Sequence, residues 1–311
     1  MARKKITVVG AGNVGAAVAH LSALNNLGDV VLLDIVEGLP QGKALDMAQS
    51  AAVSSFGGEV IGTNDWADTA GSDIVIVTSG MPRKPGMSRD DLLAKNTAIV
   101  RSVTEQIAKH CPDSFIIVVC NPLDAMVHAA AKVSGFKSNK VMGMAGALDS
   151  ARFAHLISRQ LNVDIKDIQA VLMGGHGDDM VPLPRFTSVT GIPLPELMAP
   201  EKIEELIDRT RKGGIEIVNL LGYSAYYAPA AGTVKMAEAI IADKKAVISC
   251  CAYCDSQYGI GGAFVGVPAV LGASGVEKII ELDLNTQEKQ ALDESVAHVK
   301  ELVAKVEGLL Q

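Results

Sequence analysis

The stretch that decides the fold is ITVVGAGNVGAAVAHLSALNNLGDVVLLD, residues 6–34. Its β-branched start, residues 6–9, is typical of a buried parallel strand. Three glycines at G-x-G-x-x-G spacing follow, and the small residues of 16–24 then predict a helix. Residues 30–33 predict a second buried strand, which Asp34 closes. A strand, a glycine turn, a helix and a strand ending in an acid predict a dinucleotide-binding βαβ unit.

Each glycine of this turn has its own physical role. Gly10 permits the tight turn from strand to helix, and Gly12, which has no Cβ, lets a pyrophosphate approach the backbone. Gly15 lets the helix pack closely against the strand. The phosphates would then lie against the free N–H groups and the positive end of the helix dipole. A glycine-rich turn that binds no ligand is the alternative interpretation.

Asp34 bears on the choice of cofactor. A carboxylate at the end of the second strand accepts hydrogen bonds from both ribose hydroxyls and repels a 2′-phosphate. We therefore expect NAD rather than NADP. The alternative is a solvated acid at the end of a strand.

Composition narrows the class of protein. The chain has 311 residues, 49% of them hydrophobic, with a mean hydropathy of +0.27. This length is enough for two domains, and the apolar excess is explained by buried strands and subunit interfaces. No apolar run approaches the roughly 18 residues that a membrane span requires. A net charge of −7 without a basic block disfavours nucleic acid as a partner.

The N-terminus and the cysteines predict a cytoplasmic protein. The first ten residues, MARKKITVVG, lead directly into a strand and lack the features of a signal peptide. The five cysteines are an odd number, and the C-x-x-C of Cys251 and Cys254 has no second pair or nearby histidine to complete a zinc site. We expect buried free thiols and no metal.

After residue 34 the first half of the chain alternates between strands and helices. Alternation of this kind predicts a parallel, doubly wound sheet, and we assign residues 1–146 to an NAD-binding Rossmann domain. The further strands are expected at 59–63, 73–78, 115–120 and 141–144, and the further helices at 42–55, 88–110 and 124–133.

The second half, residues 147–311, does not continue the regular alternation of strands and helices, and we predict that it forms an α+β substrate domain. Five prolines between residues 182 and 200 indicate a loop-rich region. Apolar positions repeat in steps of four and three along the last helix, so one face of it should be buried. Strands are expected at 169–173, 246–253 and 263–271, the last two antiparallel, and helices at 148–161, 201–221, 231–242 and 286–310.

Ligands of open α/β sheets bind outside the carboxyl ends of the strands, so the residues that follow each strand are the candidates for a site. The loop 79–89 carries Arg83, Lys84 and Arg89, and we interpret it as a lid that brings positive charge over a bound anion. A solvated basic loop is the alternative. Asn121 follows the next strand, where it could bridge cofactor and substrate or serve only as a turn residue.

Three further residues could form a catalytic group. Asp149 and Arg152 lie three positions apart on one face of a predicted helix, and His176 lies in a glycine-flanked turn at the end of a strand. Asp149 could fix the tautomer of the His176 imidazole and raise its pKa, while Arg152 could bind a substrate carboxylate with two hydrogen bonds. Spacing alone does not show whether the three meet.

Five motifs in both halves resemble those of the lactate/malate dehydrogenase family, and most closely of its lactate-dehydrogenase-like malate dehydrogenases. They are GAGNVG at 10–15 with Asp34, TSGMPRKPGMSRDDLL at 78–93, VCNPLD at 119–124, LDSARF at 148–153 and GGHGDDMVP at 174–182.

The resemblance implies a role for each matching residue. His176 would be the proton acceptor when malate is oxidised, and Asp149 its partner. Arg152 would hold the C1 carboxylate, Arg89 would polarise the C2 oxygen, and Asn121 would contact substrate and cofactor. The implied NAD contacts are Gly10, Ala11, Gly12, Asn13, Val14, Gly15, Asp34, Asn96, Val119, Cys120 and Asn121.

Arg83 is the position that the resemblance links to substrate choice. Lactate enzymes of the family carry a neutral glutamine there, whereas an arginine supplies a partner for the second carboxylate of malate or oxaloacetate. A dicarboxylate buried with only one cation would leave one charge unpaired, which is costly. Lys84 is adjacent, so if the match to the family is shifted by one position, a cation still pairs with the second carboxylate but that cation is Lys84.

Three other functions remain open at this point. A lactate or other 2-hydroxyacid dehydrogenase is the nearest one. NAD- and metal-dependent glycosidases share the dinucleotide fold and use a Cys and a His as ligands, here Cys120 and His176. A non-catalytic NAD sensor would not need His176. The resemblance also suggests a homodimer or homotetramer.

Overall fold

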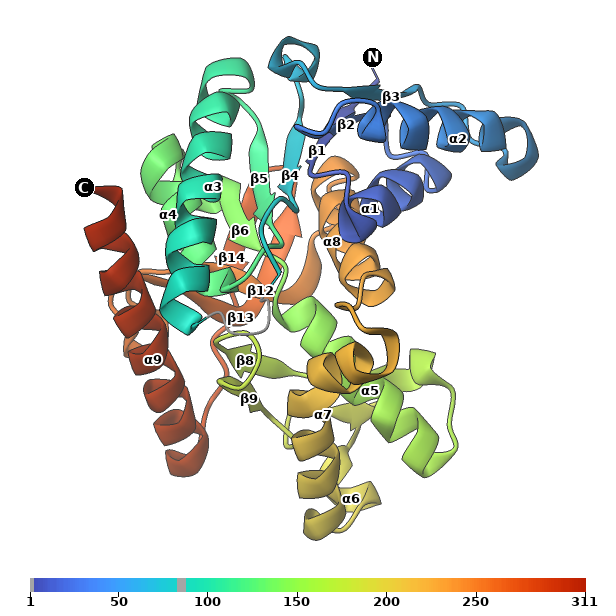
Figure 1. Ribbon diagram of the computed structural model, residues 1–311. Helices are drawn as coiled ribbons and strands as arrows, with labels where there is room; N and C mark the ends of the chain where they lie inside the picture. Colours follow the sequence, from blue (N-terminus) through green and yellow to red (C-terminus); the bar gives the residue numbers. More distant parts are fainter. Residues whose placement is uncertain (1–2, 83–87) are drawn as a thin grey trace.

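The computed structural model describes residues 3–82 and 88–311 (Figure 1). Its centre is a mixed sheet in the order β3-β2-β1-β4-β5-β6-β12-β13-β8-β9, with β14 paired to β13. The strands of this sheet are β1 (Lys5–Val9), β2 (Asp29–Leu33), β3 (Val60–Thr63), β4 (Ile74–Val77), β5 (Phe115–Val118), β6 (Val141–Gly143), β8 (Leu172–Gly174), β9 (Met180–Pro182), β12 (Ala246–Cys254), β13 (Ala263–Gly272) and β14 (Gly275–Ile279).

Helices cover both faces of the sheet, and a second, three-stranded sheet lies apart from it. The helices are α1 (Asn13–Leu24), α2 (Leu39–Ser54), α3 (Arg89–His110), α4 (Leu123–Ser134), α5 (Gly146–Leu161), α6 (Leu194–Leu197), α7 (Pro200–Leu221), α8 (Tyr227–Ile241) and α9 (Thr286–Leu310). The small sheet consists of β7 (Ile168–Gln169), β10 (Ser188–Val189) and β11 (Ile192–Pro193).

The first six strands are parallel and have the strand order of a doubly wound sheet, as expected. Alternate residues of β4 explain why the sheet is buried on both faces. Ile74 and Ile76 belong to the core that α1 and α8 cover, whereas Val75 and Val77 belong to the core under α3, α4 and α9. Because neither face meets water, the strand is a continuous apolar run.

The second half of the chain extends the same sheet with antiparallel strands. β12 joins β6 through the pair Cys251 and Gly143, and β12 and β13 pair from Ala246 opposite Leu271 to Cys254 opposite Ala263. The antiparallel pair expected from the sequence is therefore confirmed. The junction places the first residues of α5 immediately after β6, at the carboxyl edge of the parallel strands.

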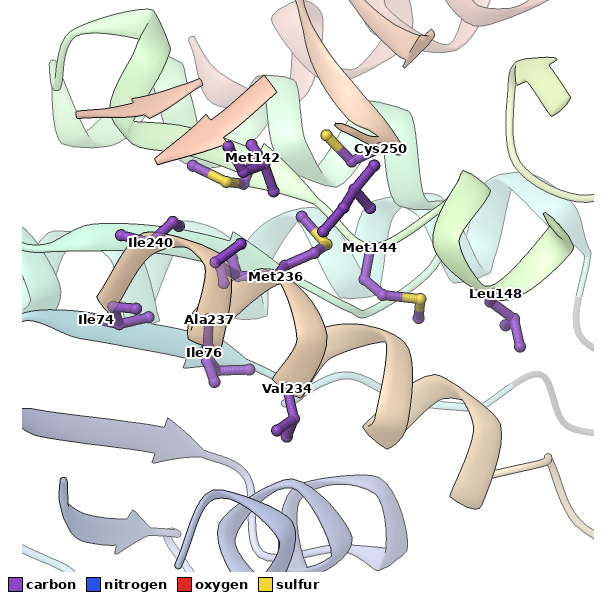
Figure 2. Close-up of a cluster of buried hydrophobic side chains, with 14 of the residues drawn as sticks. Ile74, Ile76, Met142, Met144, Leu148, Val234, Met236, Ala237, Ile240 and Cys250 are labelled. Atoms are coloured by element: carbon purple, nitrogen blue, oxygen red, sulfur yellow. The ribbon is translucent and has the colours of Figure 1, made fainter. Parts of the chain in front are cut away.

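Helix α8 ties the two halves together. It lies beside α1 and across the parallel strands, although it comes from the second half of the chain (Figure 1). Its side chains pack into the cluster drawn in Figure 2, with Val234, Met236, Ala237 and Ile240 close to Ile74, Ile76, Met142, Met144, Leu148 and Cys250. The halves thus share a hydrophobic core, which holds their facing edges in a defined position.

Several elements differ from the sequence prediction. The single strand expected at 169–173 is two strands: β7 pairs with β10 in the small sheet, and β8 pairs with β9 and β13 in the large one. Strand β14 was not predicted, because GVEKI alternates too briefly to be recognised without its partner β13. Of the helices in the described residues, none has the apolar length to cross a membrane.

Candidate active site

The glycine turn after β1 has the geometry that its sequence predicts. Gly10 has a φ of +105°, and a Cβ there would lie 2.8 Å from the backbone nitrogen of Ser79. A Cβ on Gly15 would lie 1.7 Å from the carbonyl oxygen of Gly10, so helix and strand could not pack this closely with any other residue. The predicted roles of these two glycines in the turn and in helix packing are confirmed.

The N-terminus of α1 fits a phosphate group. Gly12 is its N-cap and supplies no side chain to the first amides, and the first turn contains no acidic residue. A Cβ on Gly12 would have no atom within 4 Å, so the space in front of these amides is open. Uncapped N–H groups at the positive end of a helix beside open space favour an anion.

Asp34 lies across from this turn at the end of β2. Its Oδ2 accepts a hydrogen bond from the Ala11 amide at 2.6 Å, and its Oδ1 accepts one from the Val36 amide at 3.0 Å. Lys43 of α2 donates to the Ala11 carbonyl oxygen at 2.7 Å, so a cation lies beside the same turn. The sequence prediction missed Lys43, although it is the first basic residue after Asp34.

Asn96 is buried and connects two loops at the carboxyl edge of the sheet. Its Oδ1 accepts a hydrogen bond from the Met81 amide at 2.8 Å, and its Nδ2 donates to the Asn121 carbonyl oxygen at 2.6 Å. These bonds hold the loops after β4 and β5 together, which is a different contribution from a direct contact with NAD. The direct contacts expected for Asn96, Val119, Cys120 and Asn121 remain predictions.

The structure brings His176 and Asp149 together. His176 follows β8, Asp149 lies in the first turn of α5, and the distance from imidazole Nδ1 to carboxylate Oδ2 is 2.8 Å. The side chains are 14% and 3% exposed, so little water competes for this hydrogen bond. A carboxylate can only accept, so Nδ1 carries the proton and the lone pair of neutral histidine is on Nε2.

The surroundings of His176 raise its pKa above the ordinary value of 6.5. Burial by itself lowers the pKa of an imidazole, and so does the positive charge of Arg152. The charge of Asp149, its hydrogen bond and the charge of Asp124 outweigh both effects. The imidazolium form is therefore stabilised, as required of a group that accepts a proton and keeps it during a reaction.

Arg152 lies next to this pair with its guanidinium largely enclosed. Its Nη1 is 3.5 Å from Oδ1 of Asp149, and its side chain is 17% exposed. Burial lowers the pKa of Arg152, and Asp149 partly offsets that effect. A Cβ on Gly213 of α7 would lie 3.3 Å from Arg152 Cδ, so this glycine makes room for the side chain. Within the described ranges the one anionic partner of Arg152 also binds His176, so Arg152 can bind a further anion.

Arg89 lies at the edge of the same site. It is the first residue of α3, and Ser88 and Asp91 form a capping box at the N-terminus of this helix. Its side chain is 81% exposed, and its guanidinium lies 3.7 Å from the carboxylate of Asp178, two positions after His176. Arg83, Lys84 and the central part of the loop 79–89, which we interpret as a lid, lie outside the described residues.

Metal ligands were not expected, and the five cysteines were expected to be buried free thiols. All five are free and buried, and burial raises the pKa of Cys120 to about 12. No cluster of three or more His, Cys, Asp or Glu side chains among residues 3–82 and 88–311 could hold a metal ion.

Sequence reasoning missed two residues that bind the main chain around His176. Asp124 accepts a hydrogen bond from the His176 amide. Ser295 of α9 accepts one from the Gly175 amide and donates one to the Asp179 carbonyl oxygen. Each had a signal. Asp124 is an acid just inside the N-terminus of α4, and Ser295 is a polar residue between Leu292 and Val296 on the apolar face of α9.

Comparisons with known proteins show the family to which the chain is similar. The family model for the lactate/malate dehydrogenase NAD binding domain matches residues 4–143, and the model for the alpha/beta C-terminal domain matches residues 146–309. The chain is 58% identical to the malate dehydrogenase of Rhodopirellula baltica, with 100% of this chain and 99% of that protein covered.

Two solved structures are similar over nearly the whole chain. The malate dehydrogenase from Salinibacter ruber has a TM-score of 0.95 at 52% identity, with 98% of each chain covered. The lactate dehydrogenase from Cryptosporidium parvum, solved with lactic acid and nicotinamide adenine dinucleotide, also has a TM-score of 0.95, at 45% identity and with 99% of each chain covered.

These matches confirm the predicted fold class, a Rossmann NAD-binding domain followed by an α+β domain, and NAD as the cofactor. The two matched ranges cover both halves of the chain, residues 4–143 and 146–309. The chain belongs to the lactate/malate dehydrogenase family.

Proposed function

We propose that this chain is an NAD-dependent malate dehydrogenase, which interconverts (S)-malate and oxaloacetate and can serve the tricarboxylic acid cycle. The observation that carries the chemistry is the hydrogen bond between His176 and Asp149 beside the enclosed guanidinium of Arg152. An imidazole held by a carboxylate beside an enclosed guanidinium suits proton transfer on a carboxylate-bearing substrate. Relatives named malate dehydrogenase at 52–58% identity support the choice of substrate.

The dinucleotide would be held by the residues around the N-terminus of α1. The amides of the GAGNVG turn would bind the pyrophosphate, Asp34 would bind the ribose, and Asn96, Val119, Cys120 and Asn121 would line the part nearer to His176. The open space at Gly12 and the uncapped helix support this placement. We place the boundary between the cofactor domain and the substrate domain after residue 146.

The protein's own groups would bind and orient the substrate and move its proton. Arg152 binds the C1 carboxylate, and Arg83 binds the second carboxylate. Nε2 of His176 accepts the proton of the C2 hydroxyl when malate is oxidised, while Asp149 stabilises the imidazolium that forms. Bound NAD⁺ supplies the acceptor for the hydride that leaves C2. In the reverse direction the imidazolium and Arg89 polarise the ketone oxygen of oxaloacetate, and Asn121 orients the substrate.

The pKa of His176 predicts opposite pH dependences for the two directions. Malate oxidation needs neutral imidazole, so kcat/KM for malate rises as pH increases through the raised pKa. Oxaloacetate reduction needs imidazolium and falls over the same interval. Asp149→Asn removes the main stabilising charge, so both curves should move to lower pH. Initial rates in both directions between about pH 5 and pH 9 test this, and profiles that do not change in opposite directions, or that stay in place in Asp149→Asn, would contradict it.

Asp34 is expected to control the discrimination between NADH and NADPH. In Asp34→Ser the carboxylate that repels a 2′-phosphate is gone, so kcat/KM for NADPH relative to NADH should rise by about tenfold or more, the effect of roughly 1.4 kcal/mol. Asp29→Ser is the matched control, because it removes a carboxylate at the opposite end of β2. An unchanged ratio in Asp34→Ser would remove this residue from cofactor selection.

The second candidate is an L-lactate or other 2-hydroxyacid dehydrogenase, because the solved lactate dehydrogenase is structurally as similar as the solved malate dehydrogenase. Initial rates with oxaloacetate and pyruvate, each with NADH and NADPH, separate the two. The proposed function predicts the highest rate with oxaloacetate and NADH. A higher kcat/KM for pyruvate would favour the alternative.

We further propose that the protein acts as a homodimer or homotetramer. Large apolar side chains are exposed on α2, at Leu45 and Val53, and on α7, at Ile215 and Leu220. Such exposure is more easily explained by a covered face than by solvent. Sedimentation equilibrium at several protein concentrations gives the number of subunits, and a monomer throughout would contradict the proposal.

A further inference from the structure

The turn that carries His176 is held through its main chain by two other helices. Ser295 Oγ of α9 accepts a hydrogen bond from the Gly175 amide at 2.8 Å and donates one to the Asp179 carbonyl oxygen at 2.7 Å. Oδ2 of Asp124, in α4, accepts a hydrogen bond from the next amide, that of His176, at 2.9 Å. Two consecutive amides of the turn are thus fixed by buried side chains from different halves of the chain.

The glycines of the turn are required by this close approach. A Cβ on Gly174, whose φ is +80°, would lie 2.6 Å from Ser295 Oγ. A Cβ on Gly175 would lie 3.0 Å from a methyl of Val299, also in α9. The turn therefore rests directly on α9, and Ser295 interrupts the apolar face of that helix at the point where the turn needs a hydrogen-bond partner.

Asp124 contributes charge as well as a hydrogen bond. It is a buried carboxylate in the first turn of α4, where the helix dipole favours a negative charge. In the described part of the chain its Oδ1 has no hydrogen-bond partner, which is unusual for a buried oxygen. Burial raises the pKa of Asp124, and the hydrogen bond from the His176 amide and the charge of His176 act in the opposite direction.

Charge balance explains why a second carboxylate is useful here. Among residues 3–82 and 88–311, the ionisable groups that face His176 are Asp149 and Arg152 from α5 and Asp124 from α4. The Cys251 thiol of β12 faces Asp124 and, with a pKa raised well above its usual value by burial, stays neutral. When His176 is protonated, Asp149 alone would have to compensate two cations, His176 and Arg152. With the negative charge of Asp124 added, the two carboxylates balance the two cations.

We propose that Asp124 and Ser295 are positioning residues for His176: together they fix the two amides of its turn, and Asp124 supplies the second negative charge that stabilises the imidazolium. This inference rests on the proposed role of His176 as proton acceptor. Ser295 acts through geometry alone, whereas Asp124 acts through geometry and charge. The two contributions can therefore be separated by substitution.

Asp124→Asn keeps an oxygen that can accept the His176 amide but removes the charge. Oxaloacetate reduction should then decline at lower pH than in the unsubstituted protein, so that activity at pH 8 falls by about tenfold while activity at low pH is retained. Asp124→Ala removes both contributions and should lower kcat across the whole range. If Asp124→Asn does not fold, Asp124→Ser provides a smaller neutral acceptor, and the same shift to lower pH is expected.

Ser295→Ala should lower kcat by about tenfold at every pH without moving the profile, because no charge is lost. The dissociation constant for NADH should stay unchanged in all these variants. Asp73→Asn is the matched control: Asp73 also accepts a backbone hydrogen bond, from the Lys5 amide at 2.9 Å, but it lies before β4 and away from His176. Its pH profile should equal that of the unsubstituted protein.

An NMR titration of the full chain with ¹³C-labelled histidine gives a readout that does not depend on activity. The His176 signal, assigned from its loss in His176→Gln, should titrate at lower pH in Asp124→Asn and unchanged in Asp73→Asn. An unchanged midpoint and an unchanged rate profile in Asp124→Asn would overturn the inference while leaving the proposed function intact. Full activity in His176→Gln would instead overturn the proposed function.

Discussion

Replacing Arg83 with glutamine is expected to lower kcat/KM for oxaloacetate by about two to three orders of magnitude and to raise the relative use of pyruvate. Enclosing a dicarboxylate with only one cationic partner leaves one carboxylate unpaired, at a cost on the order of 3 kcal/mol or more. Pyruvate carries a methyl group in place of the CH2–COO⁻ group of oxaloacetate, so it has no second carboxylate and loses no contact when the guanidinium is removed. The measurement is kcat/KM for both keto acids with NADH.

Lys84→Gln is the matched control for this substitution. It removes one positive charge from the neighbouring position, so it reports the effect of net charge in the loop without the proposed contact. Its ratio of oxaloacetate to pyruvate use should stay close to that of the unsubstituted protein. If Lys84→Gln lost the discrimination and Arg83→Gln kept it, the role would belong to Lys84. Unchanged discrimination in both variants would remove the loop from substrate choice.

Replacing His176 with glutamine is expected to lower kcat in both directions by about three orders of magnitude, because general acid–base catalysis by a positioned side chain contributes about 10²–10⁴-fold. Binding of NADH should be retained, since His176 lies on the turn after β8 and not in the glycine turn after β1. Stopped-flow or steady-state rates together with NADH fluorescence titration separate the two effects.

His155→Gln is the control for this second substitution. His155 lies on the exposed side of α5, the helix that carries Asp149 and Arg152, so the change alters the same helix without touching the site. Its rates should equal those of the unsubstituted protein. A fully active His176→Gln would instead show that another group moves the proton. Bound NADH without turnover in the unsubstituted protein would favour a protein that binds NAD without catalysis.

Local features of the site could be predicted from the sequence because they depend on nearby residues. The positive φ of Gly10 and the close contact at Gly15 follow from one turn between one strand and one helix. The start of the helix expected at 88–110 is also local, as is the first turn of α5 with Asp149 and Arg152 on one face. In each case the physical requirement and the residue that meets it lie within about two turns of helix.

Features that depend on distant packing could not be predicted in the same way. The pairing of His176 with Asp149 requires β8 to lie beside the start of α5, which follows from the sheet order and not from spacing; the family resemblance implied it. The bonds from Asp124 and Ser295 need α4 and α9 to meet at one turn. For the same reason 169–173 was expected as one strand, since only the partners β10 and β13 divide it.

We propose that two guanidinium groups bind the two carboxylates of a four-carbon diacid beside His176. A crystal structure of the complex with NADH and an unreactive dicarboxylate analogue, hydroxymalonate, tests it most directly. We predict one carboxylate on Arg152, the other on Arg83 and the hydroxyl within hydrogen-bond distance of His176 Nε2. A complex with the second carboxylate bound by other groups, and Arg83 in solvent, would contradict the assignment of malate as the substrate.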